Sequence, residues 1–244
     1  MADNMTEDPT PTPAISRRRL LVAGGVGLAI GAVGTEIGNL ATGSSSTSTT
    51  TTPPDVDLMQ EHGVLKRVLM IYQESLRRID AGQQPPMSEI HEGATIIHDF
   101  IEAFHEALEE GYVFPMLRNA GILVSTVDTL FVQHARGRQL TQLILSGSSS
   151  TTTTSNTQAV AGAMTSFVRM YEPHEAREDT VVFPAFRATH TSEQLDELAA
   201  TFADLQRQQI GPDGFAKTVA AVAAIEKKLG IYDLDQFTPA PTVQ

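Results

Sequence analysis

Two short segments of this 244-residue chain carry the residues best suited to chemistry. The first begins at His105 and reads HEALEEGYVFP, and the second begins at His174 and reads HEAREDTVVFP. Each segment places its histidine four residues before a glutamate, Glu109 or Glu178. On an α-helix, residues four apart lie one turn apart on the same face, so an imidazole nitrogen and a carboxylate oxygen there can reach one metal ion. The same pair in the same context, 69 residues apart, therefore predicts a metal site.

Two single histidines, His62 and His134, complete this pattern. Each interrupts an otherwise apolar stripe on a predicted helix, and the order along the chain becomes H, HxxxE, H, HxxxE. The single histidines are 72 residues apart, close to the 69 that separate the two pairs. Four buried imidazoles and two buried carboxylates without a metal would carry a large desolvation cost. Each half could therefore supply two histidines and one glutamate, and the two glutamates could bridge two metal ions.

The elements that must position these residues are helices. Helix-forming residues dominate, and no run shows the alternating pattern of a strand. We expect helices over residues 56–79, 88–119, from 126 to about 145, 157–189, from 192 onward, and from about 214 to 229. The fold class is all-α: an antiparallel four-helix bundle, which would bring the six side chains to one level, with two additional C-terminal helices. Thr191 and Gln194 predict a capping box for the first of those two helices.

Prolines qualify the helix predictions at two places. Pro115 lies inside the second pattern, so a kink or a helix end is expected near Phe114. Pro173 directly precedes His174 and should bend the fourth helix or split it in two. His98 lies on the predicted inward stripe of the second helix, and we expect at most a supporting role for it.

The composition divides the chain into five regions. They are an N-terminal signal or anchor segment (1–41), a Ser/Thr-rich linker (42–54), a helical bundle (55–190) that contains a second Ser/Thr-rich tract expected to be a loop (146–157), a C-terminal helical pair (191–234) and a loose tail (235–244). Matching motifs on both sides of the inner tract indicate a loop rather than a domain boundary.

The N-terminal segment resembles a twin-arginine export signal. Arg17, Arg18 and Arg19 precede a short Gly/Ala-rich apolar run that starts at Leu20. We therefore expect export across the cytoplasmic membrane by the twin-arginine translocase, to the cell envelope or the medium. If the signal stays uncleaved, it is the expected means of membrane attachment. Export of a folded protein suits a site that is loaded with metal beforehand, because metal binding and folding are coupled.

Charge and cysteine usage restrict the partners and the metals. The net charge of −12 argues against nucleic acid as a partner. The chain has no cysteine, which excludes disulfides, thiolate–zinc sites, iron–sulfur clusters and a cysteine nucleophile. A metal site built from histidines and carboxylates suits iron, manganese or zinc.

The pattern H…HxxxE…H…HxxxE, with Phe-Pro after each pair, resembles the hemerythrin-like (HHE) cation-binding family over about residues 56–190. The resemblance implies a four-helix bundle that holds two non-haem iron ions. The ligands it implies are His62, His105, Glu109, His134, His174 and Glu178. Oxygen-carrying members have a further histidine at a position that is Leu130 or Arg138 in this chain, so a site that reacts with or senses its ligand is favoured over reversible oxygen carriage.

Several functions and further ligands stay open at this point. The resemblance implies binding, sensing or reaction of dioxygen or peroxide, including catalase-like or oxidase-type activity. Iron storage or buffering without catalysis is the alternative, and a metal-free helical adaptor is another. Asp179 is an alternative to Glu178 as the second carboxylate ligand. Glu106 and Glu175 could be ligands or support ligands, but a solvated helix surface is the more common place for such residues.

Overall fold

The computed structural model describes residues 52–149 and 153–241, and within these ranges the chain is helical and contains no strand. This confirms the all-α class that the sequence predicts. The predicted export segment, residues 1–41, and nearly all of the predicted linker lie outside the described residues. None of the described helices is both long enough and apolar enough to cross a lipid bilayer.

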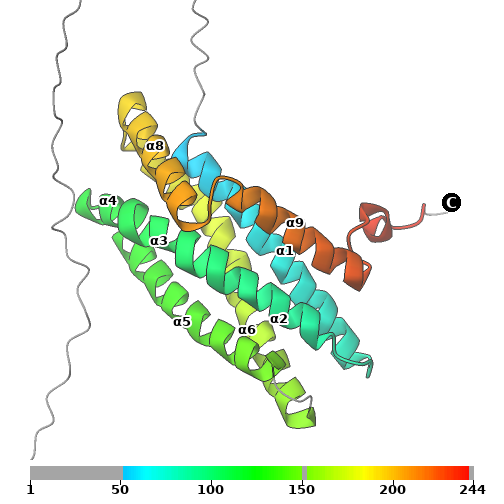
Figure 1. The fold of residues 1–244 in the computed structure, drawn as a ribbon. Coiled ribbons are helices and arrows are strands. Elements are labelled where there is room, and N and C mark those ends of the chain that lie inside the picture. The colour runs from blue at the N-terminus through cyan, green and yellow to red at the C-terminus, as the bar shows by residue number, and fades with distance from the viewer. Residues whose placement is uncertain (1–51, 150–152, 242–244) are drawn as a thin grey trace, which may run out of the picture. The chain divides into compact units, whose positions relative to one another are not determined.

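Six helices longer than two turns form the framework (Figure 1). They are α1 (Pro54–Asp80), α2 (Met87–Ile96), α5 (Val124–Ser149), α6 (Thr154–Arg177), α8 (Ser192–Gln209) and α9 (Gly214–Leu229). Shorter elements continue α2 and α6: η1 (Ile97–His105), α3 (Glu106–Leu108), η2 (Glu109–Val113) and α4 (Phe114–Asn119) after α2, and η3 (Glu178–Val182) and α7 (Phe183–Ala188) after α6. A 3₁₀ turn, η4 (Leu234–Phe237), lies in the predicted loose tail.

The helices that carry the motif residues pack against one another. α5 packs against α6 and α2, and α1 packs against the same two helices. The apolar stripes of these helices form one buried core. The motif histidines lie on the same helix faces as these stripes, so packing of the core turns them inward. α9 packs against α1 and α2, and α8 packs against α1. The predicted capping box is confirmed, because the Thr191 and Gln194 side chains each bond the other's backbone N–H at the start of α8.

Three stretches of π-helix lie at the ligand-bearing positions. η1 ends at His105, η2 begins at Glu109 and η3 begins at Glu178. A π-helix bonds each N–H to the carbonyl five residues back and is often found at functional sites. Pro115 and Pro184 follow η2 and η3, in the first turn of α4 and α7. Near Phe114 the second helix therefore changes from π-helix to α-helix and does not end.

α6 runs through Pro173 as one helix, so the predicted split does not occur, and the bend at Pro173 stays a prediction. Two other details of the sequence prediction are wrong. The tract 146–157 is largely helical, because α5 continues to Ser149 and α6 begins at Thr154, where Thr153 caps it. The His98 side chain is 47% exposed and pairs with its neighbour Asp99, because the π-helical η1 changes the register that a continuous α-helix would give.

Candidate metal centre

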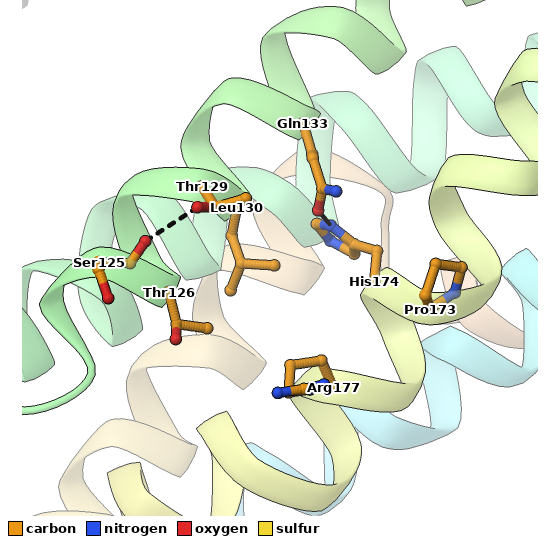
Figure 2. A pocket seen from close by; sticks show the side chains of 8 residues that line it. All are labelled: Ser125, Thr126, Thr129, Leu130, Gln133, Pro173, His174 and Arg177. Carbon is orange, nitrogen blue, oxygen red and sulfur yellow. Dashed lines mark hydrogen bonds between the residues drawn. The ribbon is translucent and has the colours of Figure 1, made fainter.

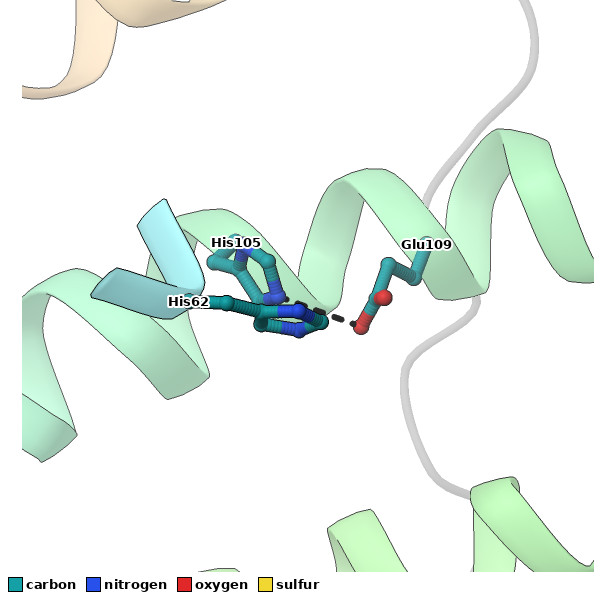
Figure 3. Close-up of side chains that lie close together, drawn as sticks. All are labelled: His62, His105 and Glu109. Atoms are coloured by element: carbon teal, nitrogen blue, oxygen red, sulfur yellow. Dashed lines mark ion pairs between the residues drawn. The ribbon is translucent and has the colours of Figure 1, made fainter. Parts of the chain in front are cut away.

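His62, His105 and Glu109 form the first cluster (Figure 3). Their donor atoms lie within 4.8 Å of one another. The ring centroids of His62 and His105 are 4.8 Å apart, and His105 Nε2 is 3.6 Å from Glu109 Oε2. All three side chains are buried. α1 therefore brings its single histidine to the first HxxxE pair, as the sequence predicts.

His134, His174 and Glu178 form the second cluster, with the same composition. The Nε2 atoms of His134 and His174 are 3.2 Å apart, and His174 Nε2 lies 3.0 Å from Glu178 Oε2. Two nitrogens bound to one ion at about 2.1 Å would lie roughly 3.0 to 3.4 Å apart for angles between square and tetrahedral. The observed separation therefore suits two imidazoles on one metal ion.

Each glutamate also reaches the histidines of the other cluster. Glu109 Oε2 lies 3.4 Å from His134 Nε2. Glu178 Oε2 lies 3.4 Å from His62 Nε2. The two carboxylates therefore stand between the two histidine pairs, where each could bridge two ions. All six residues predicted from the spacing meet in this one place.

In each of the four motif histidines, the Nδ1 atom makes a hydrogen bond to a residue outside the two clusters. His62 Nδ1 donates to Asp179 at 2.7 Å and His134 Nδ1 to Glu110 at 3.0 Å. His105 Nδ1 donates to Glu61 at 2.8 Å, and His174 Nδ1 donates to the side-chain oxygen of Gln133 at 2.9 Å. These partners are oxygens that accept, so each Nδ1 carries hydrogen. The Nε2 lone pair of each neutral ring is then free for a metal, which is the arrangement that orients metal-binding histidines.

The two halves repeat this support at matching positions. The residue directly after the motif glutamate, Glu110 or Asp179, accepts from the single histidine of the other half. The residue directly before each single histidine accepts from a paired histidine. That residue is Glu61 in the first half and Gln133 in the second. The four partners therefore lie next to motif residues, which is a signal that the sequence analysis did not use except for Asp179.

The phenylalanine of each Phe-Pro dipeptide covers a histidine ring. Phe114 stacks on His134, and Phe183 stacks on His62, each with ring centroids 5.4 Å apart. Both phenylalanines are fully buried. The Phe-Pro that follows each pair therefore has a physical role, because it walls the site with apolar surface and keeps water away from the imidazoles.

Several buried polar atoms at the centre have no hydrogen-bond partner, which shows whether a metal ion fits there. None of the four oxygens of Glu109 and Glu178 makes a hydrogen bond, and neither does His62 Nε2, although all are buried. Buried polar atoms are almost always paired, so a cluster of orphans needs a ligand. The facing lone pairs of His134 and His174 likewise require a cation or a proton between them. The donor set of imidazoles and carboxylates fits a transition-metal pair.

The pKa values of the cluster show how its protons are distributed without metal. Burial alone would lower the pKa of His62, but its hydrogen bond to Asp179 and the negative charges of Asp179 and Glu178 raise it to about 9. Burial, with the nearby His62, holds the pKa of His105 well below its usual value. Burial and the neighbouring Glu178 raise the pKa of Glu109. Metal binding at neutral pH therefore has to displace a proton from His62.

The second residue of each motif is buried, which corrects the expectation of a solvated surface. Glu106 is 1% exposed and Glu175 is 4% exposed. Glu106 accepts from the Tyr171 hydroxyl at 2.6 Å and from Arg138 at 2.8 Å, while Glu175 pairs with Lys66. Both carboxylates are thus paired with other side chains. Glu106 also forms a third group with Glu110 and His134, whose donor atoms lie within 4.8 Å of one another.

Comparison with known proteins also indicates a metal-binding domain. The model of the Hemerythrin HHE cation binding domain matches residues 125–229, which include His134, His174 and Glu178. A protein of Mycobacterium tuberculosis (strain H37Rv), Rv1995, and one of Mycobacterium bovis, Mb2018, are each 42% identical to this chain over 239 residues. The aligned part covers 95% of this chain and 94% of each relative, and both relatives are described only as uncharacterized proteins.

Residues 125–229 belong to the hemerythrin HHE cation-binding family. No solved structure matches the chain. HHE domains bind metal ions, typically iron, and the two His/Glu clusters of this chain are compatible with that role. The family match covers the second cluster and continues through α9, while the first cluster comes from α1, η1 and η2.

Proposed function

We propose that this HHE protein holds a pair of iron ions in an antiparallel four-helix bundle made of α1, α2 to α4, α5, and α6 to α7. His62 and His105 would bind one ion, and His134 and His174 would bind the other. Glu109 and Glu178 would bridge the two. Manganese or zinc would be chemically acceptable to the same donors.

One observation carries this proposal. All four Nδ1 atoms are bonded outward, while the four Nε2 atoms and two unpartnered buried carboxylates converge. A cluster of core histidines would instead be satisfied by hydrogen bonds on both nitrogens. Six donors also match the demand of two ions that share carboxylates and keep coordination positions for a small ligand.

We propose dioxygen or peroxide as that ligand. Bound iron would supply the redox chemistry, and the chain would supply position and exclusion of water. Phe114 and Phe183 cover the imidazoles on two sides. The carboxylates of Glu110 and Asp179, part-exposed at the outer edge of the site, hold the Nδ1 protons of His134 and His62 and so fix the ring orientation.

Metal analysis followed by rapid mixing tests this function. The purified, iron-loaded protein should contain about two iron ions per chain, as the two clusters imply. Stopped-flow mixing with hydrogen peroxide should then show consumption or a reversible spectral change. Consumption with turnover supports a catalase-like or oxidase-type activity, and reversible uptake supports binding or sensing. Tight iron without any response to either oxidant would indicate storage or buffering, and a protein that takes up no transition metal would refute the proposal.

We also propose export by the twin-arginine translocase. The support is the arginine run at Arg17–Arg19 before a weakly apolar segment. Replacing Arg17, Arg18 and Arg19 by lysine in a fusion to a reporter that is active only after export should abolish the reporter signal. Unchanged export of the lysine variant would contradict this assignment.

A further inference from the structure

Two surface cavities reach the metal centre, one beside each histidine pair. The first, here called the α5 cavity, lies between residues 125–133 of α5 and 173–177 of α6, has a volume of about 350 Å³ and reaches His174 (Figure 2). The second, here called the α1 cavity, lies between residues 59–66 of α1 and residues 175–179 of α6 and η3, has a volume of about 280 Å³ and reaches His62. A small ligand could therefore approach either metal position.

The charges that line the two cavities differ. The α5 cavity has one charged side chain, Arg177, and no carboxylate among its lining residues. No carboxylate in the described parts of the chain pairs with Arg177. In the α1 cavity, Lys66 pairs with Glu175, and Asp179 adds a second negative charge. In a chain with a net charge of −12, the α5 cavity is therefore the approach that favours an anion.

Gln133 gives the α5 cavity a free hydrogen-bond donor. Its side-chain oxygen accepts from His174 Nδ1, so the NH₂ group of this cavity-lining residue remains available as a donor. The hydroxyls of Ser125, Thr126 and Thr129 add further polar groups along the same wall. The matching residue of the other half, Glu61, is a buried carboxylate that has no such donor.

The α5 cavity adjoins a side chain of the second metal position. His174 is part of its wall, and the opposite edge of the same ring, Nε2, faces Glu178 at 3.0 Å. Leu130 is 3% exposed and lines the cavity at its buried side. A ligand in this cavity therefore contacts His174, one of the two imidazoles that would hold the second ion.

We propose that the α5 cavity is the entry and docking site for a small inorganic monoanion, such as superoxide or the hydroperoxide anion, which binds the ion held by His134 and His174. This inference rests on the proposed function and specifies which of the two metal positions takes the ligand and in which charge state. Arg177 attracts the anion, and the Gln133 NH₂ group donates to it before it reaches the metal.

Azide, a linear monoanion that binds non-haem iron, is the probe. Iron content is measured first for wild type, Arg177→Gln, Gln133→Glu and the control Lys66→Gln, and azide is then titrated by absorption. Gln133→Glu keeps an acceptor for His174 Nδ1 but places a carboxylate on the cavity wall. Both α5-cavity variants should retain iron and bind azide at least about threefold more weakly, and the loss should shrink at high salt. Lys66→Gln should bind azide as wild type does.

Nitric oxide, an uncharged ligand, separates charge from damage to the metal site. Arg177→Gln, which replaces a side chain that makes no contact with a metal-binding histidine, should bind it with wild-type affinity. If the iron-loaded α5-cavity variants bind azide as wild type does, the α5 cavity is not the entry site. An equal loss of azide affinity in Lys66→Gln would lead to the same conclusion. Neither result would contradict the proposed iron pair. A wild-type protein without iron would instead overturn the proposed function, and metal analysis detects that before azide is added.

Discussion

In the first half of the metal centre, His105 donates its Nδ1 hydrogen to the carboxylate of Glu61, whereas in the second half His174 donates to the amide of Gln133. Both acceptors directly precede a single histidine, and both hold the paired ring in the same orientation. A carboxylate makes the imidazole a stronger donor to a metal than a neutral amide does. The two metal positions therefore have the same kinds of ligand, but the His105 imidazole should be a stronger donor to its metal ion than the His174 imidazole.

A second difference lies one turn from the ligands. Three residues before the paired histidine, the first half has Glu102 and the second has Tyr171. Tyr171 needs space, and a Cβ on Gly137 would lie 2.0 Å from its hydroxyl oxygen. The matching position in the first half is Leu65, a core residue. The comparison teaches that the donor set is duplicated while its surroundings are not, so the two ions should behave differently.

The largest effect should come from removing one paired histidine in each half. His105→Ala combined with His174→Ala removes one imidazole from each position, and the double variant should bind no stoichiometric transition metal. Elemental analysis after iron loading and desalting measures this. The single variants sharpen the comparison, because they report whether either position can hold an ion alone. Two tightly bound ions in the double variant would contradict the ligand assignment.

The phenylalanines that stack on His62 and His134 should be equally important in the two halves. Phe114→Ala and Phe183→Ala each remove a fully buried ring, and each should lower the free energy of unfolding by about 3–5 kcal/mol. Urea denaturation of the metal-free proteins measures this loss. Phe237→Ala, at a side chain that is 53% exposed, is the matched control and should change stability little. A large cost at only one of the two buried positions would break the proposed symmetry.

Adding a methyl group at Gly137 should disturb its contact with Tyr171, a contact that the first half does not have. Gly137→Ala places a Cβ against the Tyr171 hydroxyl, and we expect a loss of about 1–3 kcal/mol in unfolding free energy. Combining it with Tyr171→Phe removes the clashing oxygen and should recover part of that loss, which a double-mutant cycle measures. If the two changes add without coupling, the contact has no energetic weight.

Metal affinity should rise with pH, most at the first position. The folded pKa of His62, about 9, lies above its ordinary value of 6.5, so the ring is protonated at neutral pH and must lose a proton to bind metal. Each displaced proton changes the affinity by about tenfold per pH unit, so affinity should increase from pH 6 to about 9 and then level off. Without metal the sign is opposite: the stability due to His62 is complete below its ordinary pKa and is lost as pH rises through about 9.

Chelator competition across this pH range measures the first effect, and thermal unfolding of the metal-free protein measures the second. Asp179→Asn weakens the bond that helps to raise the pKa of His62, so it should shift both transitions to lower pH. An affinity that is constant between pH 6 and 9 would contradict the assignment of the proton to His62.

Exchanging the acceptors of the paired histidines should have the smallest effect. Glu61→Gln keeps an acceptor for His105 but removes the carboxylate, and the affinity of the first position should fall by about tenfold. Gln133→Glu should not weaken the second position. Competition titrations resolved into two binding steps measure both changes. If Glu61→Gln leaves both steps unchanged, Glu61 does not distinguish the two positions.

The residues that meet at the centre could be predicted from the sequence because their spacing alone fixes them. His105 and Glu109 share a helix face whatever surrounds them, and the second copy leaves little room for chance. Burial of Glu106 and Glu175 could not be predicted, because it depends on Lys66 and Arg138 supplied by other helices. Burial depends on tertiary contacts that a single-helix pattern does not contain.

Helix type was equally inaccessible from the pattern. A continuous α-helix places His98 inward, whereas the π-helical η1 leaves it exposed. The tract 146–157 looked like a loop because of its Ser, Thr and Gly content, yet α5 extends to Ser149. Packing of α5 against α6 overrides the weak local preference of these residues for turns.

Anomalous diffraction at the iron edge, from crystals of iron-loaded protein, tests whether the six side chains hold a pair of iron ions. Two neighbouring peaks are expected, one between His62 and His105 and one between His134 and His174, with Glu109 and Glu178 contacting both. A single peak held by Glu106, Glu110 and His134, or no peak among the four imidazoles, would contradict this expectation.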